Sequence, residues 1–149
     1  MLELYSTLEG DKELLRRLRT EESKLKDFTE PLQQSSDVVL KDIRINFDSE
    51  GGLVGGWTPL AQATIRGRIR KGYGSAPILV NTGKYKNSFR AMVDSSKAVI
   101  DAWGVTYHKY HQSMAPRIKI PRRQTLFLRE ETKKEIIRFF QEYMRFNKI

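Results

Sequence analysis

Residues 89–102, FRAMVDSSKAVIDA, contain two short runs in which side chains that suit a buried face alternate with others. Alternation with a period of two is typical of strands that bury one face. In the first run Phe89, Ala91 and Val93 share a face, and the second run repeats the pattern. The two serines at 95–96 suit a tight turn. The stretch therefore predicts an antiparallel β-hairpin with Phe89 facing inward.

Helical periodicity, with apolar residues three or four positions apart, surrounds this hairpin. We predict helices over residues 11–19, 23–47, 58–70 and 130–147, and a further short strand over residues 78–80. Pro31 predicts a kink or break in the second helix, and Thr58 with Pro59 supplies the start signals of the third. Residues 105–112 fit either a strand end or a helical turn. The fold class is α+β, a small antiparallel sheet flanked by a long N-terminal helix, a central helix and a C-terminal helix.

The length of 149 residues suits a single domain over residues 1–149. Glycine-rich stretches predict flexible loops near 48–56 and 71–76, and prolines predict an extended arm near 113–121. No apolar run is long enough for a membrane span, and no signal peptide is visible. The absence of cysteine excludes disulfides and thiolate metal sites.

Large apolar residues near turns and element ends are candidates for one shared core. We expect it to contain Trp57, Leu60, Ile78, Tyr85, Phe89, Phe127 and Phe140. Such anchors would tie the loops to the sheet, and truncating one that is fully buried costs about 3–5 kcal/mol.

The net charge of +9 is distributed unevenly along the chain. Residues 1–50 hold 8 basic and 12 acidic residues, a net charge of −4, whereas residues 51–93 hold seven basic residues and no acidic one. This asymmetry favours either a polyanionic partner or a head-to-tail contact between copies. A basic face that is merely solvated would give the same count.

Patterns that carry catalysis are weak. His108 and His111 are three residues apart, but a zinc site needs three or four ligands, and Asp101 is the one carboxylate near them in the sequence. Lys84 and Ser88 lack a visible third partner. The glycine-rich loop follows a predicted helix, whereas a phosphate-binding loop follows a strand. We therefore predict no catalytic, cofactor or metal site, and no enzyme.

The basic stretch RGRIRK at residues 66–71, followed by Tyr73, is suited to contact with nucleic acid. Arginines pair with phosphates, and an aromatic ring can stack on a base. No recognised nucleic-acid-binding motif surrounds the stretch. Contact with a protein, or plain solvation, therefore stays open.

Five short motifs follow one another from residue 57 onward. They are WTPL at 57–60, ILVNTGKYKNS at 78–88, YHKYHQ at 107–112, IPRR at 120–123 and FL at 127–128. No single motif is specific, but their order resembles that of the virion-morphogenesis, or tail-completion, family of Mu-like phages. That family usually has Leu where Tyr85 stands, often has Gly where Met114 stands, and has a more apolar pair in place of Gln124 and Thr125.

The resemblance implies a non-enzymatic structural subunit of a tailed-phage virion, with a tail-completion or head-to-tail joining role in the tail or neck. It implies assembly in the host cytoplasm into a homo-oligomeric ring, hexameric by family resemblance, beside tail-tube or neck and connector proteins. Contact with DNA in the channel is left open, and no membrane or cofactor is implied. The alternative is a basic protein that binds nucleic acid independently of sequence.

Eight residues are candidates for contact with another copy or a partner: Arg66, Arg68, Arg70, Lys71, Tyr107, His111, Arg122 and Arg123. Arg122 and Arg123 follow Pro121 and precede an apolar run, which predicts that both guanidinium groups reach outward to a carboxylate or a phosphate. We expect them to meet acidic residues of the next copy, such as Glu21, Glu22 or Glu30, or acids of a neighbouring tail or neck protein, unless the pair only solvates a loop.

Overall fold

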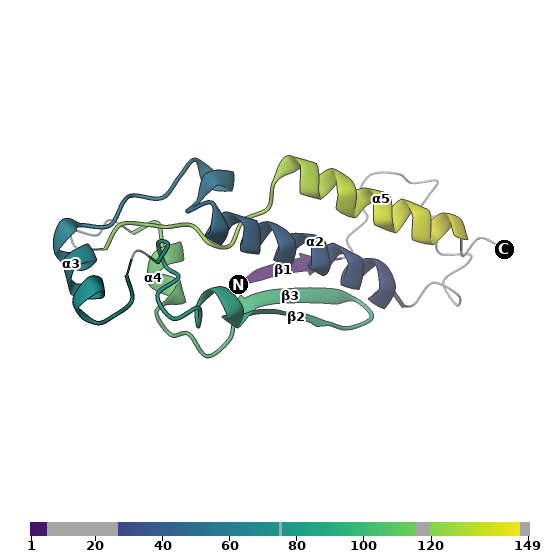
Figure 1. Cartoon of the computed structure of the whole chain (residues 1–149). Coiled ribbons are helices and arrows are strands. Elements are labelled where there is room, and N and C mark those ends of the chain that lie inside the picture. Colours follow the sequence, from purple (N-terminus) through teal and green to yellow (C-terminus); the bar gives the residue numbers. More distant parts are fainter. Residues whose placement is uncertain (6–26, 75, 116–119, 147–149) are drawn as a thin grey trace. The chain divides into compact units, whose positions relative to one another are not determined.

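The computed structural model of the chain describes residues 1–5, 27–74, 76–115 and 120–146. Its strands are β1 (Leu2–Tyr5), β2 (Phe89–Val93) and β3 (Lys97–Ala102) (Figure 1). Its helices are α2 (Thr29–Asp48), α3 (Gln62–Arg70), α4 (His108–Gln112) and α5 (Glu130–Phe146), with short 3-10 turns at Gly52–Val54 and Lys86–Ser88. The predicted α+β class is confirmed. The helix predicted over 11–19, and residues 116–119 of the arm predicted near 113–121, lie outside the described residues.

The chain groups into two compact units. Unit 1 comprises Met1–Val39, Ala91–Ile100 and Leu128–Ile149, and unit 2 comprises Leu40–Arg90 and Asp101–Phe127. Both units include part of α2 and part of the hairpin that β2 and β3 form. The single domain expected over the whole chain stays a prediction.

β3 is the central strand of the sheet, with β1 on one side and β2 on the other. β1 runs antiparallel to β3 and places Leu2 opposite Ile100. The predicted hairpin is confirmed, and the side chains of β2 and β3 alternate in burial as expected. Asp94 closes its turn, because the carboxylate accepts hydrogen bonds from the backbone N–H groups of Ser96 and Lys97.

α2 begins at Thr29, so Pro31 lies in its first turn and marks the start of the helix rather than a kink inside it. A proline in the first turn costs no hydrogen bond, because the N–H groups there have no partner within the helix. The carboxylate of Asp27 accepts the N–H of Thr29 at 2.9 Å and caps this end. Residues 23–26 of the predicted helix lie outside the described part of the chain.

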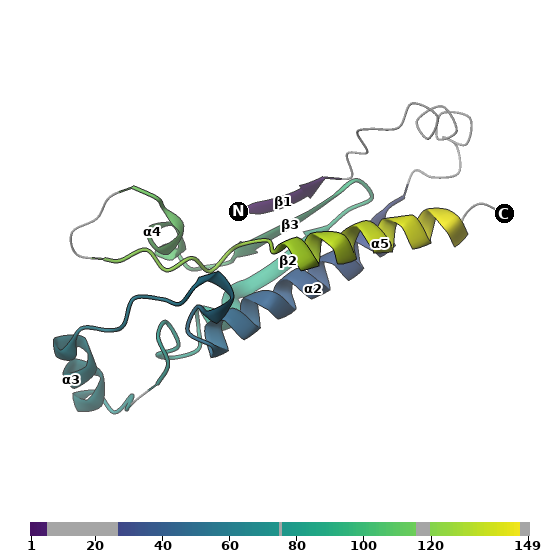
Figure 2. The same cartoon turned by 90° about the horizontal axis from the view of Figure 1, so that it is seen from above.

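In unit 1, α5 runs alongside the first half of α2 (Figure 2). The ring of Phe28 packs against those of Phe140 and Tyr143, at centroid distances of 5.8 and 6.1 Å. The hydroxyl of Tyr143 donates to the backbone carbonyl of Asp27 at 2.6 Å. The predicted C-terminal helix is thus confirmed as α5. The prediction for Phe140 was wrong, because Phe28 gives it a partner in unit 1, apart from the other expected core residues.

Phe47, near the end of α2, is the centre of the aromatic core of unit 2. Its ring lies edge-on at 5.3 Å from the rings of both Trp57 and Tyr85, and 5.7 Å from that of Phe89. Such contacts add stabilisation beyond the apolar area that they bury. Five of the expected core residues are buried in this unit, Trp57, Ile78, Tyr85, Phe89 and Phe127, and Leu60 is half-buried.

The central helix begins at Gln62 and not, as predicted, at Thr58. A helix that started at Thr58 would use the Thr58 carbonyl for its first hydrogen bond, to the N–H of Gln62. That carbonyl instead accepts the guanidinium of Arg123, as does the carbonyl of Pro59. A residue far along the chain thus overrides a local start signal. The predicted end of the helix, at Arg70, is confirmed.

Residues 78–80 form a turn and not the predicted strand. Leu79 has a φ of +61°, and the N–H of Val80 donates to the carbonyl of Pro77. A residue in the left-handed region cannot continue a strand. Ile78 alone keeps the buried position expected for the run.

The glycine-rich loop at 48–56 has a defined hydrogen-bond pattern. The N–H of Gly51 donates to the carbonyl of Asn46, which continues the end of α2 into the loop. Gly51 has a φ of +88°, and a Cβ at this position would lie 2.4 Å from the ring of Trp57. The flexibility expected for this loop and for residues 71–76 stays a prediction that hydrogen exchange would test.

Candidate functional site

Four side chains form a buried polar cluster in unit 2, namely Tyr85, His108, Gln112 and Thr125. Tyr85 precedes a 3-10 turn, α4 carries His108 and Gln112, and Thr125 lies in the segment before α5. The Tyr85 hydroxyl lies 2.7 Å from Nδ1 of His108 and 2.8 Å from Oγ1 of Thr125. Three separate segments of the chain therefore meet at one phenol group.

Burial sets the protonation of this polar cluster. It lowers the pKa of His108 below its usual range, although the Asp101 carboxylate, 3.6 Å from Nε2, opposes the shift. Burial also raises the pKa of the Tyr85 phenol well above its usual value. Nδ1 of the imidazole shares a hydrogen bond with the Tyr85 hydroxyl, and Nε2 faces the Asp101 carboxylate. At neutral pH the phenol and the imidazole are therefore an uncharged hydrogen-bonded pair.

The Gln112 side chain binds the backbone of the segment that precedes α5. Its Oε1 accepts the N–H groups of Thr125 and Leu126 at 3.0 and 3.1 Å, and its Nε2 donates to the carbonyl of Leu126. A side-chain amide thus satisfies backbone groups that a neighbouring strand would otherwise satisfy. The sequence singled out His-Gln as part of a motif, but it carried no signal for this partner.

The same segment is held by two further side chains. Nε1 of Trp57 and Nδ2 of Asn46 both donate to the carbonyl of Gln124, at 2.9 and 3.1 Å. Trp57 therefore has a polar role beside its place in the aromatic core. The backbone of residues 124–126 is therefore held at successive residues by side chains from α2, from residue 57 and from α4.

Arg123 does not reach outward as predicted. It is 7% exposed, and its Nε and Nη2 donate to the Thr58 carbonyl at 3.1 and 2.9 Å. Burial lowers the pKa of this guanidinium, which still stays protonated at neutral pH. Successive residues of an extended segment point to opposite sides, so Arg123 shares the inward side with Thr125, which is fully buried, while Arg122 faces away. Arg123 is thus a structural tie between two segments of unit 2, and its predicted interface role is corrected.

The other candidates near the polar cluster differ in exposure. Arg122 is exposed, and its Nε donates to the carbonyl of Gln112 at 3.2 Å. Tyr107 is 41% exposed, with its ring edge-on to Tyr85 at 5.4 Å. His111 is half-buried and stacks on Tyr85 at 5.8 Å, with 29° between the ring planes. Arg122 and Tyr107 keep surface that a partner could contact, whereas His111 packs on the core.

α3 carries the predicted basic stretch. Three of its candidates are exposed, namely Arg66, Arg70 and Lys71. Arg68 is half-buried, and its Nε donates to Oδ1 of Asn81 at 3.0 Å while its Nη2 donates to the carbonyl of Pro77 at 3.2 Å. Arg68 therefore ties residues 77–81 to the helix. The three exposed cations, in contrast, remain accessible to a partner.

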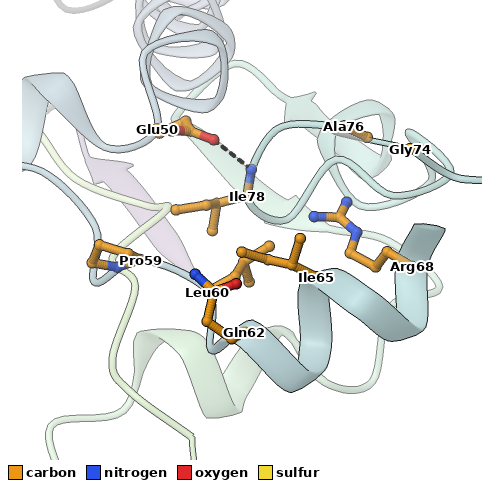
Figure 3. A pocket seen from close by; sticks show the side chains of 9 residues that line it. All are labelled: Glu50, Pro59, Leu60, Gln62, Ile65, Arg68, Gly74, Ala76 and Ile78. Atoms are coloured by element: carbon orange, nitrogen blue, oxygen red, sulfur yellow. Dashed lines mark hydrogen bonds between the residues drawn. The ribbon is translucent and has the colours of Figure 1, made fainter.

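A pocket of about 320 Å³ lies beside α3 in unit 2 (Figure 3). Its walls are mainly apolar, with Pro59, Leu60, Ile65, Ala76 and Ile78 among the lining residues. The charged residues at its edge are bonded to the chain, Arg68 as above and Glu50 through the N–H of Ile78 at 2.8 Å. The sequence did not predict this pocket, because its pattern favours a strand at residues 78–80, where the chain forms the turn that places Ile78 in the pocket wall.

Among the described residues, a metal-ligand cluster and a membrane-spanning helix are both absent. No three side chains of His, Asp or Glu gather there as the ligands of a metal site do. None of the helices in that part of the chain is both long and apolar enough to cross a membrane.

No family model, no curated protein and no solved structure matches the chain. The resemblance to the tail-completion family consequently rests on the order of the five motifs and on the residues that compose them.

Proposed function

We propose that the protein is a structural subunit of a tailed-phage particle, a tail-completion or head-to-tail joining protein that acts as a ring in virion assembly. The observation that supports this best is how the motif residues are used. Trp57, Tyr85, Gln112 and Arg123, from four of the five motifs, each bond to another motif or to residues beside one.

Such mutual bonding favours a scaffold over a catalyst. A catalytic group must present a proton or an electron pair to a substrate. The Tyr85 hydroxyl, the Gln112 amide and the Arg123 guanidinium are instead bonded to other parts of unit 2. The shared pattern therefore maintains the shape of this unit, and a defined shape is what a subunit that packs against copies of itself requires.

The charge distribution suits a head-to-tail ring. Each subunit of such a ring needs two unlike faces. Residues 1–50 carry a net charge of −4 and residues 51–93 carry seven positive charges. Glu30 and Asp37 are exposed on α2, and Arg66 and Arg70 are exposed on α3. Attraction between opposite charges on neighbouring copies would favour one orientation over others.

The oligomeric state tests the proposal. Sedimentation velocity and negative-stain microscopy of the full chain should show closed rings, alone or when it is coexpressed with other virion structural proteins. Arg122→Glu, which changes an exposed interface candidate, should keep the melting temperature and reduce ring formation. Lys134→Glu, on the exposed side of α5, is the matched control. A chain that stays monomeric in every one of these conditions would overturn the proposal.

A second candidate, a basic nucleic-acid-binding protein, is favoured by the exposed cations of α3. Light scattering beside a mobility-shift assay separates the two functions. Rings support the virion subunit whether or not they shift nucleic acid, whereas monomers that shift nucleic acid support the alternative.

A further inference from the structure

Four exposed cations of unit 2 lie on α3, directly after it, or on the loop that is bonded to it, and they are called here the basic face: Arg66, Arg70, Lys71 and Lys84. Arg66 and Arg70 are four residues apart, so their backbone positions lie about 6 Å apart along one side of α3. Lys84 is on the loop that Arg68 ties to the helix through Asn81.

No acidic side chain in the described part of the chain pairs with a cation of the basic face. The chain holds no Asp or Glu at all between residues 51 and 93. α5 shows the usual arrangement, since Arg138 lies 3.7 Å from the carboxylates of both Glu135 and Glu142. Concentrated positive charge without counter-charges raises the local potential and attracts polyanions.

The helix dipole does not account for all of this charge. Cations in the last turn stabilise the negative end of a helix, and Arg70 and Lys71 are placed to do so. The carbonyl groups at that end are, however, already capped by the backbone N–H groups of Lys71 and Tyr73. Arg66 lies one turn earlier and Lys84 in another segment, so neither is explained by the dipole.

We propose that the basic face binds the phosphodiester backbone of nucleic acid, independently of sequence. Phosphates repeat at short intervals along a strand, so a row of cations can contact several of them and release their counterions. The planar fork of arginine pairs with phosphate oxygens. At Gly67 and Gly72 an added Cβ would meet nothing within 4 Å, so a strand can approach the backbone of α3 closely.

An acidic protein surface fits the basic face less well. Stable protein interfaces surround a buried apolar core with a polar rim. Every residue of α3 is described, and the helix exposes one large apolar side chain, Ile69, which is 59% exposed and lies between charged neighbours. α3 thus offers little apolar surface for such a core. Tyr73 at the end of the helix is 40% exposed and can stack on a base as readily as on a side chain.

The test measures the binding of a fluorescein-labelled DNA duplex to the full chain by fluorescence anisotropy at several salt concentrations. The variant Arg66→Gln/Arg70→Gln/Lys71→Gln removes three positive charges from the basic face. We expect its affinity to fall about tenfold or more, and the slope of log K against log salt to lose about 2.7, which is 0.9 for each of three phosphates. The melting temperature should stay unchanged.

The matched control is Lys133→Gln/Lys134→Gln/Arg138→Gln, which removes the same charge from α5, where acids alternate with the cations. It should bind the duplex within about twofold of the unchanged chain, because salt screens distant charges. Equal binding by the basic-face variant and the unchanged chain would overturn the proposal. So would displacement of the duplex by polyglutamate at equal charge concentration, which would assign the face to an acidic protein.

This inference is independent of the proposed virion role. Rings that bind no duplex would refute the basic face alone. Duplex binding that the basic-face variant abolishes, by a chain that forms no rings, would refute the ring alone.

Discussion

Tyr85 and Thr125, 40 residues apart in the sequence, share a hydrogen bond of 2.8 Å in the core of unit 2. Both positions depart from the pattern of the tail-completion family proposed above, which has Leu at the first and a more apolar pair around the second. A hydroxyl buried alone at either position would cost about 1–3 kcal/mol. The two departures compensate each other, and His108 supplies the remaining partner of the phenol.

A double-mutant cycle should detect this compensation. We expect Tyr85→Phe and Thr125→Val each to lower the free energy of unfolding by about 1–2 kcal/mol, because each leaves a buried partner unsatisfied. The double variant should lose less than the sum, with a coupling of about 1 kcal/mol in urea unfolding. Strictly additive losses would show that the two hydroxyls do not support each other.

Gln112 should matter more to stability than its half-buried position suggests. Gln112→Ala leaves the N–H groups of Thr125 and Leu126 without their acceptor, and we expect a loss of about 2–4 kcal/mol. Gln62→Ala, at an exposed position of α3, is the control and should change stability by less than about 0.5 kcal/mol. Similar denaturation midpoints for the two variants would contradict the role assigned to Gln112.

Charge reversal should destabilise the protein strongly at one of the two neighbouring arginines and hardly at all at the other. Arg123→Glu places a carboxylate against the carbonyl oxygen of Thr58, and we expect it to cost more than about 3 kcal/mol, as an unpaired buried charge does. Arg122→Glu should change stability by less than about 0.5 kcal/mol, because its side chain is exposed. Thermal melts of the single variants measure the difference. Equal melting temperatures would mean that Arg123 is not the tie described above.

Gly51 and Gly55 form a matched pair for separating backbone strain from collision. Both have a φ near +90°, at 88° and 89°, so Ala at either position pays the cost of the left-handed region, about 1–2 kcal/mol. Only at Gly51 would the new Cβ collide, with Trp57, whereas at Gly55 it meets nothing within 4 Å. We expect the free energy of unfolding of Gly51→Ala to be lower than that of Gly55→Ala by about 1–3 kcal/mol. Chemical denaturation of both variants gives the comparison.

Stability should fall with acidification partly because of His108. Burial lowers its pKa from the usual 6.5, so below that pH the unfolded chain binds a proton that the folded chain does not. The contribution is therefore present above pH 6.5 and is lost as the pH falls from there towards the lower pKa of the folded state. His108→Gln should flatten the pH dependence of urea unfolding in this range, and His111→Gln serves as the control. An unchanged slope in His108→Gln would exclude the imidazole as the source.

Features that depend on local pattern could be predicted from the sequence. The alternation in residues 89–102 and the periodicity of α5 arise from side chains that neighbour one another along the chain, and both elements were found as expected. β1 was missed, because a strand of 4 residues offers too little alternation to stand out, and its partner lies near residue 100.

Features that depend on distant partners could not be predicted. Thr58 and Pro59 are residues that usually start a helix, but the Thr58 carbonyl accepts a hydrogen bond from an arginine 65 residues away. Arg122 and Arg123 are identical in type and adjacent, and Arg123 faces inward because the distant carbonyls of Thr58 and Pro59 accept its guanidinium. The polar cluster was missed for the same reason, since Tyr85, which its motif marks as an apolar anchor, has polar partners on two other segments.

The division of the chain into units has a consequence for the order in which it folds during synthesis. Unit 2 is made of residues 40–90 and 101–127, all of which leave the ribosome before α5. The polar cluster and the Arg123 tie can therefore form on a nascent chain that still lacks the partner of Phe28, since Phe140 is translated later. Units generally fold as their residues emerge. A chain stalled on the ribosome that ends at residue 127 and continues into an unstructured linker long enough to fill the exit tunnel should thus carry a protease-resistant unit 2 while unit 1 is still incomplete.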